Sequence, residues 1–191
     1  MEARKVQIKF FIDSPADVDV APIVPVFHDW IRQNAFDELL IDVTEYGHVP
    51  EAPALLLVGS ASDYAIDFAD GRPGVLYSRK RQAPSDLEAC ILDALRRALA
   101  AAKRLEQEPS LPAKIRFRGD ELVLRLNDRL RAPNTPRTLA AVEPVLRAAL
   151  AVLYAGIAFR IEPVGEPRDL FGVRVTAPGA PGVSDLLARI A

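Results

Sequence analysis

Residues 64–79 read YAIDFADGRPGVLYSR and favour two β-strands joined by a tight connection. Tyr64, Ile66 and Phe68 alternate with Ala65 and Asp67, and this period of two is typical of a strand with one buried face. The loop at 70–74 is rich in Gly and Pro, and a second strand is expected at Val75–Arg79. The stretch therefore predicts an antiparallel hairpin.

Further strand patterns occur on both sides of this hairpin. Residues 55–59 are apolar on both faces, as in a central strand that is covered on both sides. The remaining strands are expected at Val6–Ile12, Leu39–Tyr46, Lys114–Arg118, Glu121–Asn127, Ile157–Glu162 and Phe171–Thr176. Gly119-Asp120 has the composition of a two-residue hairpin loop, so the strands on its two sides are predicted to pair with each other.

Helical periodicity appears in four segments. The first is expected at about Pro22–Asn34, and a short one closes the chain at Ser184–Ile190. A long helix is expected from Ser85 to about Glu108, because Ser85 and Glu88 have the spacing of a capping box. In the fourth segment, Thr135 precedes Pro136 and predicts a capped helix start.

These elements predict an α+β protein. We expect mixed or mostly antiparallel sheets of about nine strands, with three main helices and a short C-terminal helix. The composition changes most sharply near Gln82–Pro84 and separates a βα-ββββ half, 1–84, from an αββαββα half, 85–191. The two halves are expected either as subdomains or as one compact domain.

The composition excludes several classes of protein. Half of the 191 residues are hydrophobic and 26% are charged, as in a folded globular protein. The net charge of −2 gives no global attraction for nucleic acid or an anionic membrane. Cys90 is the only cysteine, and no signal-peptide core or membrane span is expected, so we predict a cytoplasmic protein. Abundant Ala, Arg and Pro suggest a bacterial source.

The residues that could exchange protons near neutral pH are concentrated in one stretch. His28, Asp29, Tyr46 and His48 are candidate catalytic residues for acid-base chemistry, provided that both imidazoles face one hollow. Their spacing matches no pattern of metal ligands, so no metal is expected. Neither of the two glycine-rich phosphate loops is present, and no cofactor is expected.

The densest basic cluster consists of Arg72, Arg79, Lys80 and Arg81, together with the aromatic residue Tyr77. These side chains are candidate ligand-binding residues, because guanidinium and ammonium groups bind carboxylates and phosphates through charge-assisted hydrogen bonds. The alternative interpretation is a solvated edge strand whose charges oppose aggregation.

Three functional hypotheses follow. The leading one is a non-catalytic binding or assembly module whose partner is a protein or a small acidic ligand. The second is a small enzyme that uses His28, Asp29, Tyr46 and His48. The third is single-stranded nucleic-acid binding through Tyr77 and the basic residues 79–81, which is less favoured. A homodimer is also expected, because the helical stripes are apolar and rich in alanine.

Overall fold

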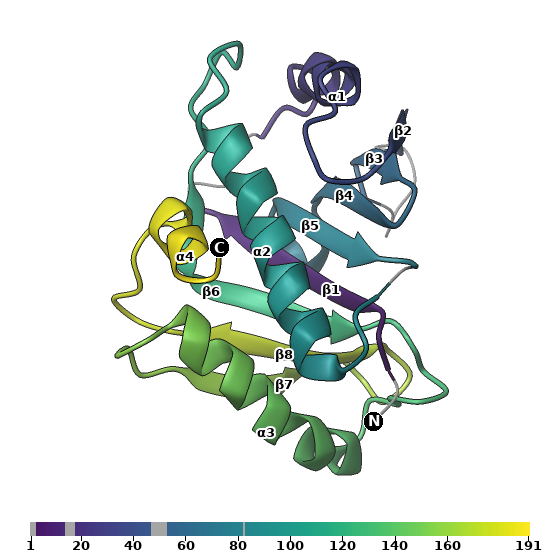
Figure 1. Cartoon of the computed structure of the whole chain (residues 1–191), viewed down its shortest axis with the longest axis vertical. Helices are drawn as coiled ribbons and strands as arrows, with labels where there is room; N and C mark the ends of the chain where they lie inside the picture. The colour runs from purple at the N-terminus through teal and green to yellow at the C-terminus, as the bar shows by residue number, and fades with distance from the viewer. Residues whose placement is uncertain (1–2, 14–17, 47–52, 82) are drawn as a thin grey trace.

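One antiparallel sheet of eight strands organises the chain in the computed structural model, which describes residues 3–13, 18–46, 53–81 and 83–191 (Figure 1). The strands are β1 (Val6–Ile12), β2 (Leu40–Glu45), β3 (Leu55–Gly59), β4 (Ser62–Asp67), β5 (Gly74–Arg79), β6 (Phe117–Leu126), β7 (Arg160–Val164) and β8 (Phe171–Thr176). Their order across the sheet is β2-β3-β4-β5-β1-β6-β8-β7. Because β1 lies between β5 and β6, strands from both halves of the chain are hydrogen-bonded into the same sheet.

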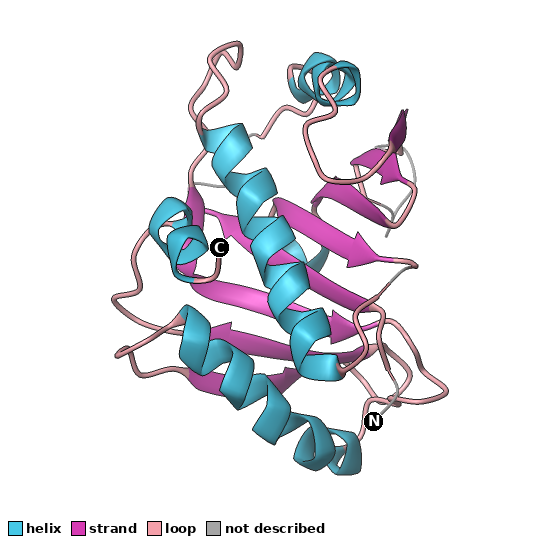
Figure 2. Cartoon of the chain, viewed as in Figure 1, coloured by secondary structure: helices cyan, strands magenta, loops and turns pink. Residues whose placement is uncertain are grey.

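Three of the four helices cover one face of the sheet. These are α2 (Leu87–Glu106), α3 (Pro136–Leu153) and α4 (Val183–Arg189), whereas α1 (Ile23–Arg32) lies near the β2 end (Figures 1 and 2). Buried side chains of alternate strand residues, such as Ile8 and Leu124, form the core together with the apolar side of α2. No helix of the described ranges has the length and apolar character needed to cross a membrane.

No α-helix formed by the described residues lies over the opposite face of the sheet, yet Lys9 and Phe11 on this face are fully buried. Lys9 Nζ lies 2.6 Å from Asp67 Oδ2 and 2.5 Å from the carbonyl oxygen of Ala69, which belongs to the 3-10 turn η1 (Ala69–Gly71). Arg72, just after this turn, lies 4.0 Å from the ring centroid of Phe11. The β4–β5 connection is therefore held over the sheet by Lys9, whose pKa is lowered mainly by burial.

The hairpin that residues 64–79 predict is confirmed. Strands β4 and β5 pair in antiparallel register, with Tyr64 opposite Tyr77 and Ile66 opposite Val75. The predicted helix starting after Thr135 is also confirmed, since Thr135 Oγ1 accepts a hydrogen bond from the Thr138 amide at 3.3 Å.

The hairpin predicted at Gly119-Asp120 is wrong, and the sheet has eight strands instead of nine. Strand β6 runs without interruption through both residues and pairs with β1 and β8. Gly119 is needed for a close approach: a Cβ there would lie 2.0 Å from the Pro181 carbonyl oxygen. Its own carbonyl accepts a hydrogen bond from the Tyr154 hydroxyl at 3.0 Å. The glycine thus serves tertiary packing, which a local turn rule does not detect.

The predicted capping box of α2 is also corrected by one residue. Asp86 is the N-cap, and its Oδ1 accepts a hydrogen bond from the Ala89 amide at 2.8 Å. A carboxylate at this position satisfies the free amide and also interacts favourably with the positive end of the helix dipole.

Candidate ligand-binding site

The proposed catalytic stretch is only partly described by the structure. His28 lies on the exposed side of α1, and the neighbouring Asp29 forms an ion pair with Arg32 on the same helix. Tyr46 follows the end of β2 and is 37% exposed. No hydrogen bond or ion pair joins His28, Asp29 and Tyr46 to one another in the described part of the chain. His48 lies outside the described residues.

The basic cluster is divided between different surfaces of the sheet. Lys80 pairs with Asp63 at 2.6 Å, and Arg72 pairs with Glu121 on the face that carries no α-helix. Arg81 is exposed. Tyr77 and Arg79 point to the other side, toward α2, and the Tyr77 ring is fully buried. A nucleic-acid base therefore has no exposed Tyr77 ring to stack on. Tyr77 and Arg79 nevertheless lie on the same face of the sheet, beneath α2.

Next to these two residues the structure contains a cavity of about 330 Å³. It lies between α2, the start of β2 and the β3–β4 turn, and we call it the polar pocket. Its lining includes Asp37, Glu38, Leu39, Arg79, Asp93 and Arg97. The register of the sheet places Ser62, which follows the lining residue Ala61, opposite Arg79, and it places Tyr64 opposite Tyr77. Asp93 and Arg97 come from successive turns of α2.

Glu38 is a buried carboxylate whose two oxygens are fully hydrogen-bonded. Its side chain is 4% exposed. Oε2 accepts from the Ala61 and Ser62 amides at 3.0 Å each, and Oε1 accepts from the Ser62 hydroxyl and from the Tyr64 hydroxyl at 3.2 Å. Two donors on each oxygen leave this carboxylate little capacity to accept from a ligand.

The Asp93 carboxylate also accepts several hydrogen bonds, in this case from three arginines. Arg79 donates to Oδ2, and Arg97 Nε lies 3.1 Å from each carboxylate oxygen. Arg96 also donates to Oδ1, at 3.0 Å. Partial burial acts to raise the pKa of the Asp93 carboxyl, but the charges and hydrogen bonds of Arg97 and Arg79 outweigh burial and lower the pKa below its usual range. Asp93 is therefore a fixed negative charge at neutral pH.

The hydrogen-bond donors of Arg79 and Arg97 have fewer partners than the carboxylate acceptors of Glu38 and Asp93. Arg97 donates to Asp93 through Nε, its Nη1 lies 3.6 Å from Glu38 Oε1, within ion-pair distance, and its guanidinium also interacts with the Tyr64 hydroxyl. The Nε of Arg79 makes no hydrogen bond to another described residue, and its Nη1 reaches the Arg81 carbonyl only at 3.5 Å. These side chains are 14% and 6% exposed, so solvent has limited access to the remaining donors.

The Tyr77 hydroxyl is buried and has no hydrogen-bond partner among the described residues. Burial raises the pKa of Tyr77 to about 12, so the hydroxyl keeps its proton at neutral pH. The Ser62 hydroxyl and the charges of Arg79 and Arg97 oppose this rise, whereas Asp93 adds to it; Tyr77 thus lies near residues that line the polar pocket but does not itself line it. A buried polar group without a partner costs about 1–3 kcal/mol, so its presence here points to a missing partner.

A second cavity, of about 240 Å³, differs in character. It lies between the end of β1, the start of α1 and the segment 111–116, and its lining includes Ile12, Val18, Ile23 and Ile115. It contains none of the buried ion pairs that surround the polar pocket. We therefore place the candidate site in the polar pocket, where concavity and convergent polar groups coincide.

Tyr77 and Arg79 are among the candidate binding residues named from the sequence, whereas Glu38, Ser62, Asp93 and Arg97 are not. The spacing of Asp93 and Arg97 is also that of an ordinary solvated helix pair. Asp93 and Arg97 lie beside the apolar stripe of α2, next to the buried Ala94, and this pattern could have indicated that the two charged side chains are partly buried.

Comparison with known proteins adds no assignment: no protein-family model matches the chain, and no curated protein sequence is significantly similar to it.

Proposed function

We propose that the protein is a non-catalytic binding module that holds a small acidic ligand, a carboxylate or a phosphate, in the polar pocket. The observation that carries the proposal is the imbalance of hydrogen-bonding capacity. Glu38 and Asp93 already accept from several donors, whereas Arg79 Nε and the Tyr77 hydroxyl donate to no described residue and Arg97 Nη1 comes no closer to Glu38 than 3.6 Å. A ligand that completes this set must supply acceptor oxygens.

The titration behaviour of the pocket favours binding over acid-base catalysis. A general acid or base works best when its pKa lies near the working pH. Here the pKa of Tyr77 is raised to about 12 and that of Asp93 is lowered, so both groups move away from neutrality. These groups are suited to holding a ligand in one orientation without exchanging protons with it.

Isothermal titration of the whole chain with inorganic phosphate, acetate and citrate at low salt tests the proposal. We expect saturable binding of at least one anion, with a stabilisation of about 2.7 kcal/mol when its concentration is 100 times the Kd. Arg97→Gln should weaken binding at least tenfold, because it removes a charged donor from the pocket.

Arg96→Gln is the matched control. Arg96 is the adjacent residue of α2 and also pairs with Asp93, but its side chain is 45% exposed and does not line the pocket. This variant should bind as the original chain does. If no anion binds saturably, or if the two variants bind equally well, the proposed function is wrong.

A further inference from the structure

The two edges of the sheet differ in their ability to accept another strand. Strand β7 carries Pro163, which has no N–H to offer, and the exposed charges of Arg160 and Glu162. Proline and charge are the usual means of protecting a sheet edge. Strand β2 at the other edge contains no proline, and no described strand pairs with its outer side.

The hydrogen-bond alternation of β2 shows which of its backbone groups face outward. Tyr46 N–H donates to the Ala54 carbonyl at 3.0 Å, and residues of an antiparallel pair alternate between bonded and non-bonded positions. Counting back from Tyr46, the backbone groups of Glu45 and Val43 point away from β3. The Val43 N–H is instead bonded at 2.8 Å to Oδ1 of the preceding residue, Asp42.

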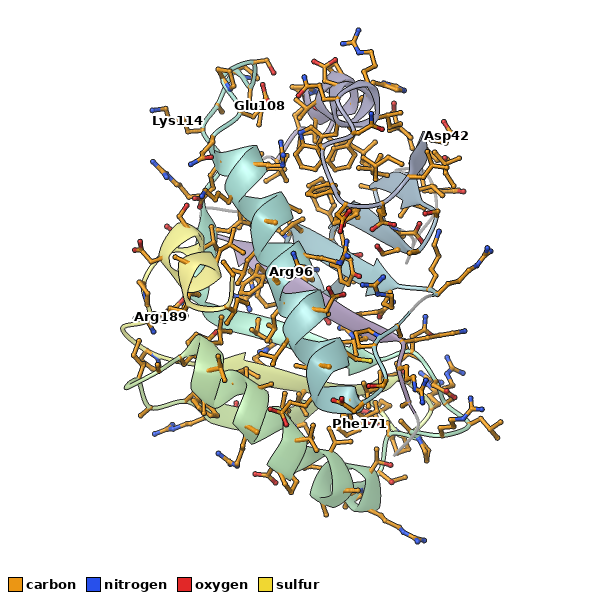
Figure 3. All side chains as sticks on the ribbon, viewed as in Figure 1. Asp42, Arg96, Glu108, Lys114, Phe171 and Arg189 are labelled. Atoms are coloured by element: carbon orange, nitrogen blue, oxygen red, sulfur yellow. The ribbon has the colours of Figure 1, made fainter. Side chains whose placement is uncertain are left out.

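The side chains along this edge combine apolar and acidic groups. Leu39 is 65% exposed and Ile41 is 55% exposed, both high values for large aliphatic residues. Asp42 projects from β2 at the periphery of the molecule (Figure 3). A strand added here would bury the two aliphatic side chains and bring its own side chains close to the carboxylates.

The stretch of sequence that contains β2 carries charge of one sign. Residues 33–71 contain no Lys or Arg but eight acidic residues. Four of the eight are paired with cations from elsewhere in the chain: Glu38, Asp63, Asp67 and Asp70. Asp37, Asp42 and Glu45 have no ion pair with any described residue, and Glu51 lies outside the described residues. The edge strand thus keeps unneutralised negative charge beside its exposed aliphatic residues.

We infer that β2 is a docking edge for an extended segment of a partner protein in which apolar residues alternate with Lys or Arg. The partner segment would pair its backbone with Val43 and Glu45. A cation that attracts the Asp42 carboxylate would also release the Val43 N–H for pairing. Two copies of this chain are a poorer fit, since antiparallel pairing of β2 with itself concentrates four carboxylates from Asp42 and Glu45 along one ladder.

Titration of the full chain with a short amidated peptide of alternating valine and lysine or arginine tests this inference. The control peptide has glutamate at each basic position. We expect the basic peptide to bind, the acidic peptide not to bind, and the affinity to fall with added salt. NMR hydrogen exchange should show new protection at the amides of Val43 and Glu45.

A charge-reversed chain provides the matched variant. Asp42→Lys with Glu45→Lys should weaken binding of the basic peptide about tenfold, as expected when two exposed attractions become repulsions. Glu162→Lys on the other edge should leave binding unchanged, and so should Arg97→Gln in the polar pocket. The last comparison separates this inference from the proposed function.

Three results would overturn the inference. They are equal binding of the two peptides, protection at amides other than those of β2, and a dimer of the peptide-free chain that Asp42→Lys abolishes.

Discussion

Replacing Tyr77 by phenylalanine should stabilise the protein that has no ligand bound. The substitution removes only a hydroxyl that is buried and has no partner among the described residues, and it keeps the ring contact with Tyr64 at 5.3 Å between centroids. Leaving such a group unpaired costs about 1–3 kcal/mol, so removing it should raise the free energy of unfolding by about 1 kcal/mol. Anion binding should weaken in the same variant, because one donor is lost.

Tyr64→Phe is the matched control, with the opposite expected sign. The Tyr64 hydroxyl donates to the buried Glu38 carboxylate at 3.2 Å, and hydrogen bonds to charged groups contribute about 1.5–3 kcal/mol. The long distance places this bond at the low end, so we expect a loss of about 1.5 kcal/mol. The ring stacked on Phe36 at 4.4 Å is retained.

The pH dependence of Tyr77→Phe adds a second readout. Because the folded pKa of Tyr77 is raised to about 12, the unfolded chain, with a value of 10, loses this proton first, so the stability of the original chain falls as the pH rises from about 10 to about 12. The advantage of the phenylalanine variant should therefore grow by about 1.4 kcal/mol between neutral pH and pH 11.

Urea unfolding of the three chains at neutral pH and at pH 11 measures all of these differences. The argument for an unpartnered hydroxyl is refuted if Tyr77→Phe destabilises the ligand-free chain as much as Tyr64→Phe does. It is also refuted if Tyr77→Phe leaves both unfolding and anion affinity unchanged, since the hydroxyl would then interact with neither protein nor ligand.

Two further substitutions test the corrected features of the fold. Asp86→Ala should cost about 1 kcal/mol of unfolding free energy through loss of the α2 cap, whereas Ser85→Ala should cost almost nothing; equal losses in thermal or urea unfolding would restore the capping box. Gly119→Ala should destabilise the protein by about 3 kcal/mol or more, because the new Cβ meets the Pro181 carbonyl at 2.0 Å, whereas Gly182→Ala meets nothing within 4 Å. A mild effect at Gly119 would show that the 181 loop shifts easily.

Several predictions that depended on neighbouring residues in the sequence were correct, whereas a prediction that ignored contacts with distant residues was wrong. The α+β class and the 64–79 hairpin depend on local periodicity and turn residues, and the structure confirms both. Gly119-Asp120 has equally good turn composition, but the distant segment at Pro181 requires the glycine for another reason. Local composition alone does not distinguish a glycine needed for a bend from one needed for a close approach.

The polar pocket could not be predicted from the sequence, because its residues come from segments that are far apart in the chain. Its lining comes from the segments 37–39 and 60–61, from Arg79 and Pro84, and from Asp93 and Arg97 of α2, and each of these looks ordinary by itself. Ser62 and Arg79 become neighbours only through the β4–β5 register, and Arg97 approaches Glu38 only because α2 crosses that end of the sheet. Such a site depends on tertiary placement, which requires the whole fold.

A purely structural role explains the ion pairs around the polar pocket but not the hydrogen-bond donors that have no partner among the described residues. Burying the Arg79–Asp93 pair and the Glu38–Arg97 pair carries a desolvation cost that well-packed apolar residues would avoid. Fixing the position of α2 on the sheet could offset that cost, and such a role would use the carboxylates as the structure does. It would have no use for the Tyr77 hydroxyl or for the Nε of Arg79, since these two donors bond to no described residue. A bound acceptor would pair both, and for this reason we interpret the cluster as a binding site.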